Sequence, residues 1–146
     1  MRDYSQIDLE FSYDGDFTIG ASGDLGDTAD NTLQSFIQEA QTRLRSELYD
    51  WTMHPHLGAA MSDLLGEPND KETAEEGQIK IISALTKDGF CNADAISIQY
   101  MPVSRHHILY KISIQLPFTR GELEDNVLTF SLLFDSNGET DGITFL

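Results

Sequence analysis

Residues 108–118 read ILYKISIQLPF and carry the clearest strand pattern in the chain. Apolar side chains fall on every second position, at Ile108, Tyr110, Ile112, Ile114, Leu116 and Phe118. Successive side chains of a strand point to opposite faces of a sheet, so this spacing predicts a strand with one buried face. Lys111, Ser113 and Gln115 take alternate positions and suit the other face.

Similar patterns on both sides of this segment predict an antiparallel meander over residues 93–146. Before it, Ile96, Ile98 and Tyr100 alternate with polar residues. After a charged loop at 119–126, residues 127–134 alternate again, and residues 143–146 form a short closing strand. The connections are short and rich in turn formers, which favours antiparallel neighbours.

Upstream of the meander the apolar residues follow a helical period. One stripe predicts a helix over 32–45, and another predicts a helix over 71–87. Between them, the same spacing recurs and predicts a shorter third helix, at Leu57, Ala60, Met61 and Leu64. Residues 7–19 alternate weakly around an Asp-Gly pair, which is typical of a hairpin turn.

Together these patterns predict an α+β fold in which three helices pack on one face of a mainly antiparallel sheet, with an N-terminal hairpin. The length of 146 residues suits a single domain. We expect residues 1–31 to form the hairpin and a loop, 32–88 the helical layer, and 93–146 the meander.

The chain is strongly acidic, with 9 basic and 25 acidic residues and a formal net charge of −16. Such a field repels phosphate, so we expect no direct binding to nucleic acid and no membrane binding. Solubility explains the charge, and so does steering toward a basic partner. The single cysteine, the lack of a long apolar run and the acidic N-terminus predict assembly in the cytoplasm.

Residues 50–58, DWTMHPHLG, are the segment most suggestive of chemistry. His54 and His56 are two positions apart, whereas a helical zinc motif needs an i, i+4 pair, so we predict no metal site and no cofactor. The structural interpretation is a corner formed by Trp51, Pro55 and Gly58, with Trp51 and Met53 wedged between two helices.

No pattern singles out a catalytic group. Acidic residues are so numerous that no pair stands out as the acid and base of a glycosidase. Cys91 with His106 or His107 would suit a nucleophile and its base, but a small buried cysteine before a strand is the commoner case. We therefore predict that the chain is not an enzyme.

Several short motifs occur in a family-like order: a Thr-Arg pair at the end of a helix, a Pro-x-x-Gly corner, and a Val-x-Val-like strand ending in Pro-Val. They are Thr42-Arg43-Leu44, His54-Pro55-His56-Leu57-Gly58, residues 96–103 (ISIQYMPV) and the strand at 109–116. From about residue 16 onward this order resembles the small, lysozyme-like baseplate wedge proteins of contractile-tailed phages, which type VI secretion baseplates share. His54 stands where the family often has Asp.

The resemblance implies a structural subunit of the virion tail baseplate that connects the wedge core to the first tail-sheath ring. It implies six copies per baseplate, with other wedge proteins and the sheath protein as partners. Sheath attachment would occur by β-strand addition, at Ile143, Thr144, Phe145 and Leu146. Wedge-core docking would use Lys87, Asp88, Gly89 and Phe90, although the family's Glu-Pro-Arg motif is absent there.

Two other functions stay open. One is a peptidoglycan-degrading hydrolase of the tail, and the other is an acidic adaptor that binds a regulator. The sequence does not distinguish a phage from a phage-derived injection system.

Overall fold

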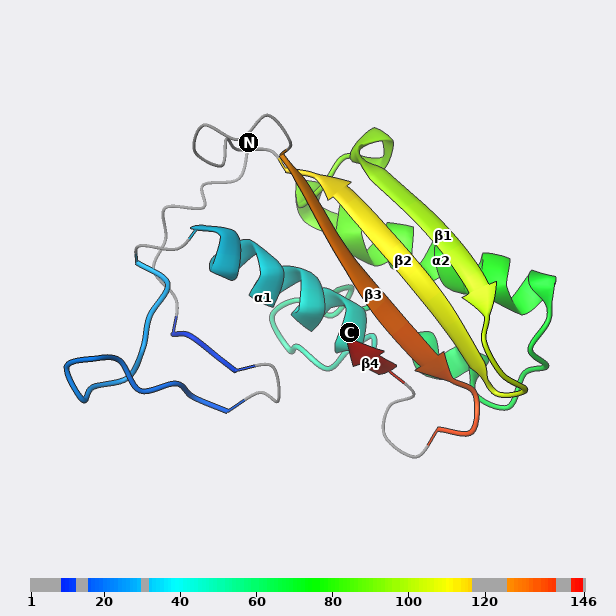
Figure 1. The fold of residues 1–146 in the computed structure, drawn as a ribbon, viewed down its shortest axis with the longest axis horizontal. Coiled ribbons are helices and arrows are strands. Elements are labelled where there is room, and N and C mark those ends of the chain that lie inside the picture. The colour runs from blue at the N-terminus through cyan, green and yellow to red at the C-terminus, as the bar shows by residue number, and fades with distance from the viewer. Residues whose placement is uncertain (1–8, 13–15, 30–31, 117–125, 139–142, 146) are drawn as a thin grey trace. The chain divides into compact units, whose positions relative to one another are not determined.

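The computed structural model describes residues 9–12, 16–29, 32–116, 126–138 and 143–145 (Figure 1). The chain divides into two compact units, Met1–Thr42 and Arg43–Leu146. Helix α1 (Thr32–Arg45) lies mainly in the first unit, and its last turn belongs to the second. No helix in the described ranges is long and apolar enough to cross a membrane.

The second unit is built on a four-stranded antiparallel sheet in the order β1-β2-β3-β4. The strands are β1 (Ile96–Pro102), β2 (His107–Gln115), β3 (Val127–Asp135) and β4 (Ile143–Phe145). Each strand therefore pairs with its neighbour in sequence, as in a meander, and β1 and β4 lie at the two edges (Figure 1).

The alternation in β2 places its apolar side chains in the core. Ile112 and Ile114 are fully buried, as is Tyr110, which is in register with Tyr100 on β1 and Leu132 on β3. Burial of each large side chain stabilises the fold by about 1.5–3 kcal/mol before chain entropy is counted. Phe118, the last residue of the predicted pattern, lies outside the described residues.

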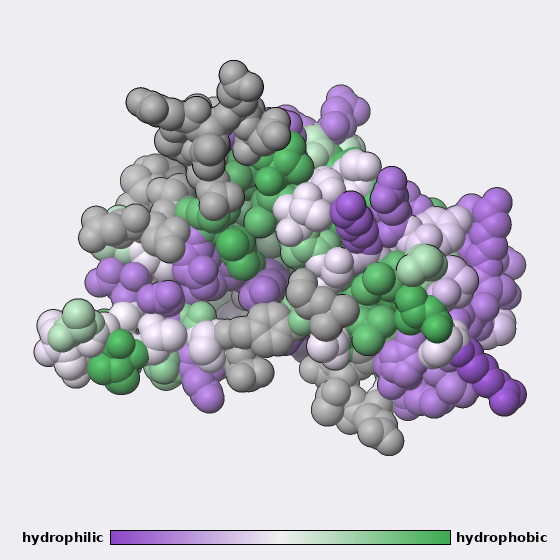
Figure 2. Space-filling model, viewed as in Figure 1, coloured by the Kyte–Doolittle hydropathy of each residue, from purple (hydrophilic) through white to green (hydrophobic). Residues whose placement is uncertain are grey.

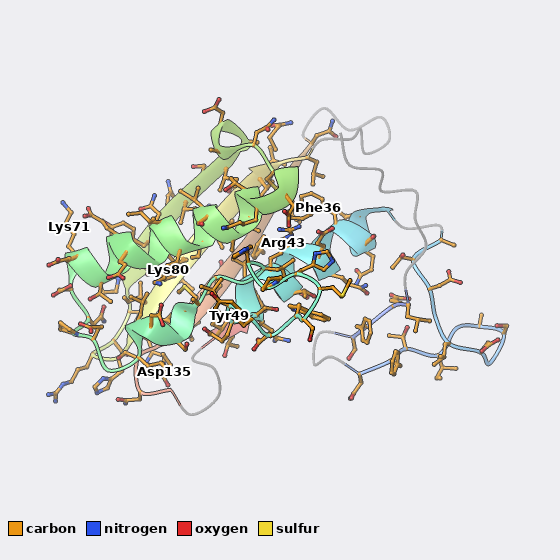
Figure 3. All side chains as sticks on the ribbon, turned by 180° about the vertical axis from the view of Figure 1, so that it is seen from behind. Phe36, Arg43, Tyr49, Lys71, Lys80 and Asp135 are labelled. Carbon is orange, nitrogen blue, oxygen red and sulfur yellow. The ribbon has the colours of Figure 1, made fainter. Side chains whose placement is uncertain are left out.

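Helix α2 (Lys71–Thr86) supplies apolar side chains along one stripe, with Ile81 and Leu85 fully buried. It lies against the same face of the sheet that carries Tyr110, because the Tyr110 hydroxyl donates a hydrogen bond of 3.1 Å to the Ala74 carbonyl oxygen. The view from behind shows α2 lying across the strands (Figure 3). A short 3-10 turn, η2 (Lys87–Gly89), follows the helix, and Asp88 takes a left-handed backbone conformation there.

The prediction of three helices is wrong. Two α-helices are present, and the segment with the third helical spacing forms only one 3-10 turn, η1 (Met61–Leu64). Gly58 (φ +140°) and Ala60 (φ +53°) both leave the right-handed helical region just before this turn. An α-helix cannot continue through residues in this conformation, so the backbone follows an irregular path here. The side chains of Met61 and Leu64 are nevertheless buried.

The first unit contains α1 and an N-terminal segment without regular strands in its described parts. Isolated antiparallel bridges join Phe11 to Phe17 and Ile19 to Leu25. The Phe11 amide donates a hydrogen bond of 2.8 Å to Gln38 Oε1 of α1. In place of two regular hairpin strands, the described residues form only single bridges. The predicted Asp-Gly turn lies outside the described residues.

The N-terminus of α2 gives a pH-dependent prediction. The Thr73 amide donates a hydrogen bond of 2.9 Å to Asp70 Oδ1, and this bond holds the pKa of the Asp70 carboxyl below its ordinary value of 3.8. A lowered folded-state pKa stabilises the protein above pH 3.8, and this stabilisation is lost as the pH falls through the folded-state pKa. Asp70→Asn keeps an acceptor oxygen but does not titrate.

We expect the melting temperature of the native chain, relative to Asp70→Asn, to fall as the pH is lowered from about 5 to about 3. Calorimetry across this range checks the prediction. A constant difference between the two proteins at every pH would show that the Asp70 charge does not stabilise the helix.

Candidate functional site

Strand β4 covers only one end of β3. It pairs Phe145 with Leu132, Thr144 with Leu133 and Ile143 with Phe134, whereas β3 has nine residues. On the side away from β2, no described strand pairs with residues 127–131 (Figure 1). We call this run, on that side, the β3 edge.

Two hydrogen bonds show which backbone groups lie along the β3 edge. The Leu116 amide donates to the Asn126 carbonyl (2.7 Å), and the Ser136 amide donates to the His106 carbonyl (2.8 Å). In an antiparallel ladder the bonded residues alternate, so the even-numbered residues of β3 bond to β2. The N–H and C=O groups of Val127, Thr129 and Ser131 consequently point away from β2.

Side-chain burial along β3 changes where β4 ends. Leu132 and Phe134, which have β4 partners, are both 0% exposed. Leu128 and Phe130 lie on the same face but are only half-buried. The Phe130 ring contacts Phe145, the last described residue of β4, with ring centroids 6.2 Å apart. The core is therefore less complete beside the β3 edge than beside β4.

The residues of β4 that the sequence assigned to strand addition differ in accessibility. Ile143 and Phe145 are buried, and the Arg45 guanidinium lies 5.0 Å from the centroid of the Phe145 ring. Thr144 is exposed, and Leu146 lies outside the described residues. A partner strand would therefore meet the backbone of β4 rather than its apolar side chains.

The residues assigned to wedge-core docking are also divided. Lys87, Asp88 and Gly89 are exposed after α2, whereas Phe90 is 2% exposed. The Arg43 guanidinium lies 4.7 Å from the centroid of the Phe90 ring, so Phe90 packs in the interior. Only the three residues before Phe90 can form a surface for a partner.

Arg43 itself has a structural role that sequence reasoning missed. Its side chain is buried, and Nη1 donates hydrogen bonds to the carbonyls of Lys87 (3.0 Å) and Ala84 (3.4 Å) at the end of α2. A cation at this end of a helix satisfies carbonyl groups and interacts favourably with the negative end of the helix dipole. The sequence signal for this role was the position of Arg43, three residues after Ala40 and therefore on the apolar face of α1.

The segment 50–58 forms a tight loop rather than a wedge between helices. A Cβ atom on Gly58 would lie 2.5 Å from the Ser46 carbonyl oxygen, so only glycine permits this backbone approach. Trp51 donates a hydrogen bond of 2.9 Å to Ser46 Oγ, yet it is 48% exposed, and Met53 is 84% exposed. The expected filling of a helix–helix space by Trp51 and Met53 is therefore not found, and Pro55 is half-buried in the same loop.

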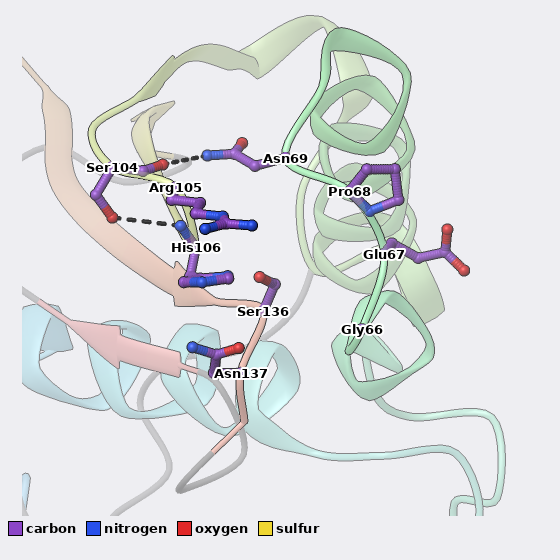
Figure 4. A pocket seen from close by; sticks show the side chains of 9 residues that line it. All are labelled: Gly66, Glu67, Pro68, Asn69, Ser104, Arg105, His106, Ser136 and Asn137. Atoms are coloured by element: carbon purple, nitrogen blue, oxygen red, sulfur yellow. Dashed lines mark hydrogen bonds between the residues drawn. The ribbon is translucent and has the colours of Figure 1, made fainter.

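A cavity of about 500 Å³ lies at the opposite end of β2 from the β3 edge (Figure 4). Its wall includes Asn69, whose amide Nδ2 donates to the Ser104 and His107 carbonyls. Ser104 Oγ is 2.7 Å from His107 Nδ1, and His107 Nε2 is 3.6 Å from Asp135 Oδ2. The last distance is too long for a hydrogen bond that would orient a catalytic imidazole, and the other contacts close the β1–β2 turn.

Neither metal ligation nor a known relative assigns a function to these features. In the parts of the chain that the structure describes, no three His, Cys, Asp or Glu residues are grouped so that they could hold a metal ion. Comparisons with protein-family models, curated proteins and solved structures give no match.

Proposed function

We propose that this chain is a structural subunit that joins its neighbours by accepting a β-strand along the β3 edge. The observation that carries the proposal is the mismatch between the nine residues of β3 and the three of β4. Unpaired backbone groups on a sheet edge bind an extended segment through main-chain hydrogen bonds, and alternate side chains set the register.

The assembly we propose is the baseplate of a contractile tail, on the basis of the motif order that resembles the small wedge proteins. In this role the chain lies in the virion tail, with the sheath protein supplying the strand and the wedge core meeting the surface formed by Lys87, Asp88 and Gly89. The net charge of −16 favours basic surfaces on both partners. No catalytic step is part of this proposal.

Proline at position 129 tests the strand-acceptor role. The Thr129 amide points away from β2, so Thr129→Pro removes a donor for an incoming strand and leaves the β2–β3 ladder intact. One backbone hydrogen bond contributes about 1 kcal/mol, and the proline ring also blocks close pairing, so we expect sheath attachment to fall about tenfold or more. Electron microscopy of particles carrying the variant measures the fraction of baseplates with attached sheath.

Leu128→Pro is the matched control. The backbone of residue 128 is hydrogen-bonded to β2, so loss of this hydrogen bond should unfold the sheet. Circular dichroism separates the two outcomes. If Thr129→Pro is folded and sheath attaches at the native level, the β3 edge is not the acceptor.

A further inference from the structure

We infer, on the basis of the proposed function, that the partner strand is a basic amphipathic segment of about four residues, with Lys or Arg alternating with large apolar residues. The apolar side chains lie in register with Leu128 and Phe130, and the cationic ones with Val127 and Thr129. This pattern follows from the side chains that lie on each face of β3.

The apolar positions follow from the incomplete core. Paired residues on neighbouring strands point to the same face, so partner residues opposite Leu128 and Phe130 face the side of the sheet that carries α2. There they would cover two half-buried side chains, as Phe145 and Ile143 cover Leu132 and Phe134. Large apolar residues at both partner positions continue the core without a void.

The alternate positions point to the opposite face of the sheet, which no described helix of the second unit covers (Figure 1). In this region that face is mostly polar: Thr129 Oγ1 lies 3.2 Å from Ser113 Oγ, and Ser131 is in register with Lys111, although Val127 at the start of β3 is apolar and 43% exposed. Exposed apolar side chains also gather near the β1–β2 turn, where Met101 is in register with Leu109, and Figure 2 shows this patch together with an apolar patch at the start of β3. The partner residues beside Val127 and Thr129 are therefore solvated.

Charge decides which polar residues fit best. A chain of net charge −16 attracts cations and repels acidic segments over the whole approach path. Lys111 opposes a cation only weakly, because it lies two strand spacings from the partner, about 9–10 Å, which is about one Debye length at physiological salt. Lys or Arg thus combines solubility on the open face with attraction to the chain.

The length of the segment follows from the length of the β3 edge. Four residues of strand span about 14 Å, which covers residues 127–130. The ladder position opposite Ser131 directly follows Phe145 along β4, so no partner residue is assigned to it. An antiparallel direction matches every other pair in the sheet.

The test uses nuclear magnetic resonance titrations of the full chain with three capped synthetic peptides. The first contains Lys-Val-Lys-Ile-Lys, the second Glu-Val-Glu-Ile-Glu, and the third has the first composition in the order Lys-Lys-Lys-Val-Ile. We expect saturable binding of the first peptide at millimolar concentration, with the largest shifts at the amides of Val127 and Thr129. We expect at least tenfold weaker binding of the other two.

Two proline variants locate the binding. Thr129→Pro should abolish binding of the first peptide, and Ile98→Pro, which alters the outer edge of β1, should leave it unchanged. Equal binding of the acidic or the reordered peptide would overturn the inferred pattern while strand addition at the β3 edge stands. No binding of the first peptide would also overturn it. Binding that is unaffected by Thr129→Pro would contradict both the inference and the proposed function.

Discussion

Gly77→Ala is expected to lower the free energy of unfolding by about 2–3 kcal/mol, although alanine is the better helix former. A Cβ atom at position 77 would lie 2.1 Å from the Tyr110 hydroxyl oxygen and 2.9 Å from Cζ of the same ring. Tyr110 is fully buried, and its hydroxyl is bonded to the Ala74 carbonyl, so the ring has no free space to move into. The strain therefore outweighs the gain in helix propensity, which is about 1 kcal/mol.

Urea denaturation of four proteins measures this effect: the native chain, Gly77→Ala, Tyr110→Phe and the double variant. Tyr110→Phe alone removes one hydrogen bond and should cost about 1 kcal/mol. It also removes the atom closest to the new methyl group, so the double variant should be more stable than the sum of the two single effects predicts. Additive losses would show that α2 does not contact β2 through this pair.

Arg43→Ala is expected to lower the free energy of unfolding by about 3–4 kcal/mol. The change leaves the Ala84 and Lys87 carbonyls without this donor and removes the cation from the Phe90 ring. It also opens a cavity, because Arg43 is the largest fully buried side chain described. Buried acceptors that lose their donor carry most of the cost.

Three matched variants separate the contributions of packing, charge and hydrogen bonding to this loss of stability. Arg43→Met keeps most of the packing but no donor, Arg43→Lys keeps a charge without the planar fork, and Arg45→Ala removes the neighbouring, half-buried arginine. We expect Arg45→Ala to cost about 1 kcal/mol or less. If Arg43→Ala costs no more than Arg45→Ala in thermal and urea unfolding, Arg43 does not anchor the end of α2.

The sheet was predictable because its periodicity comes from the chain itself. The alternation through Tyr110 and Ile112 fixes which face of β2 is buried, whatever packs against it. The Asp70 cap is a local feature of the same kind, since its side chain bonds to an amide only three residues further on. These features depend on residues that are close in sequence.

Apolar spacing alone does not define the structure of residues 50–64. Leu57, Ala60, Met61 and Leu64 have helical spacing, but spacing carries no information on the left-handed backbone at Ala60. Trp51 was expected inside because it is large and apolar, yet its indole N–H binds Ser46 and the ring stays half-exposed. Local geometry of this kind depends on tertiary hydrogen bonds.

The candidate site could be located only in part. The sequence indicated a terminal strand at an edge, but the β3 edge exists because β4 pairs with Leu132–Phe134 and no further along β3. Register between segments ten residues apart is set by the whole sheet and by the connecting loop. The burial of Arg43 likewise depends on the end of α2, which is 41 residues away.

Hydrogen exchange at single amides of β3 shows whether the β3 edge is open. If the β3 edge is open, the amides of Thr129 and Ser131 exchange rapidly in the isolated chain, whereas those of Leu128 and Phe130, bonded to β2, are protected. Pairing with a partner strand should then protect Thr129 as well. Protection of Thr129 and Ser131 in the isolated chain, at the level of Leu128 and Phe130, would rule out strand addition at the β3 edge, because the edge would already be occupied.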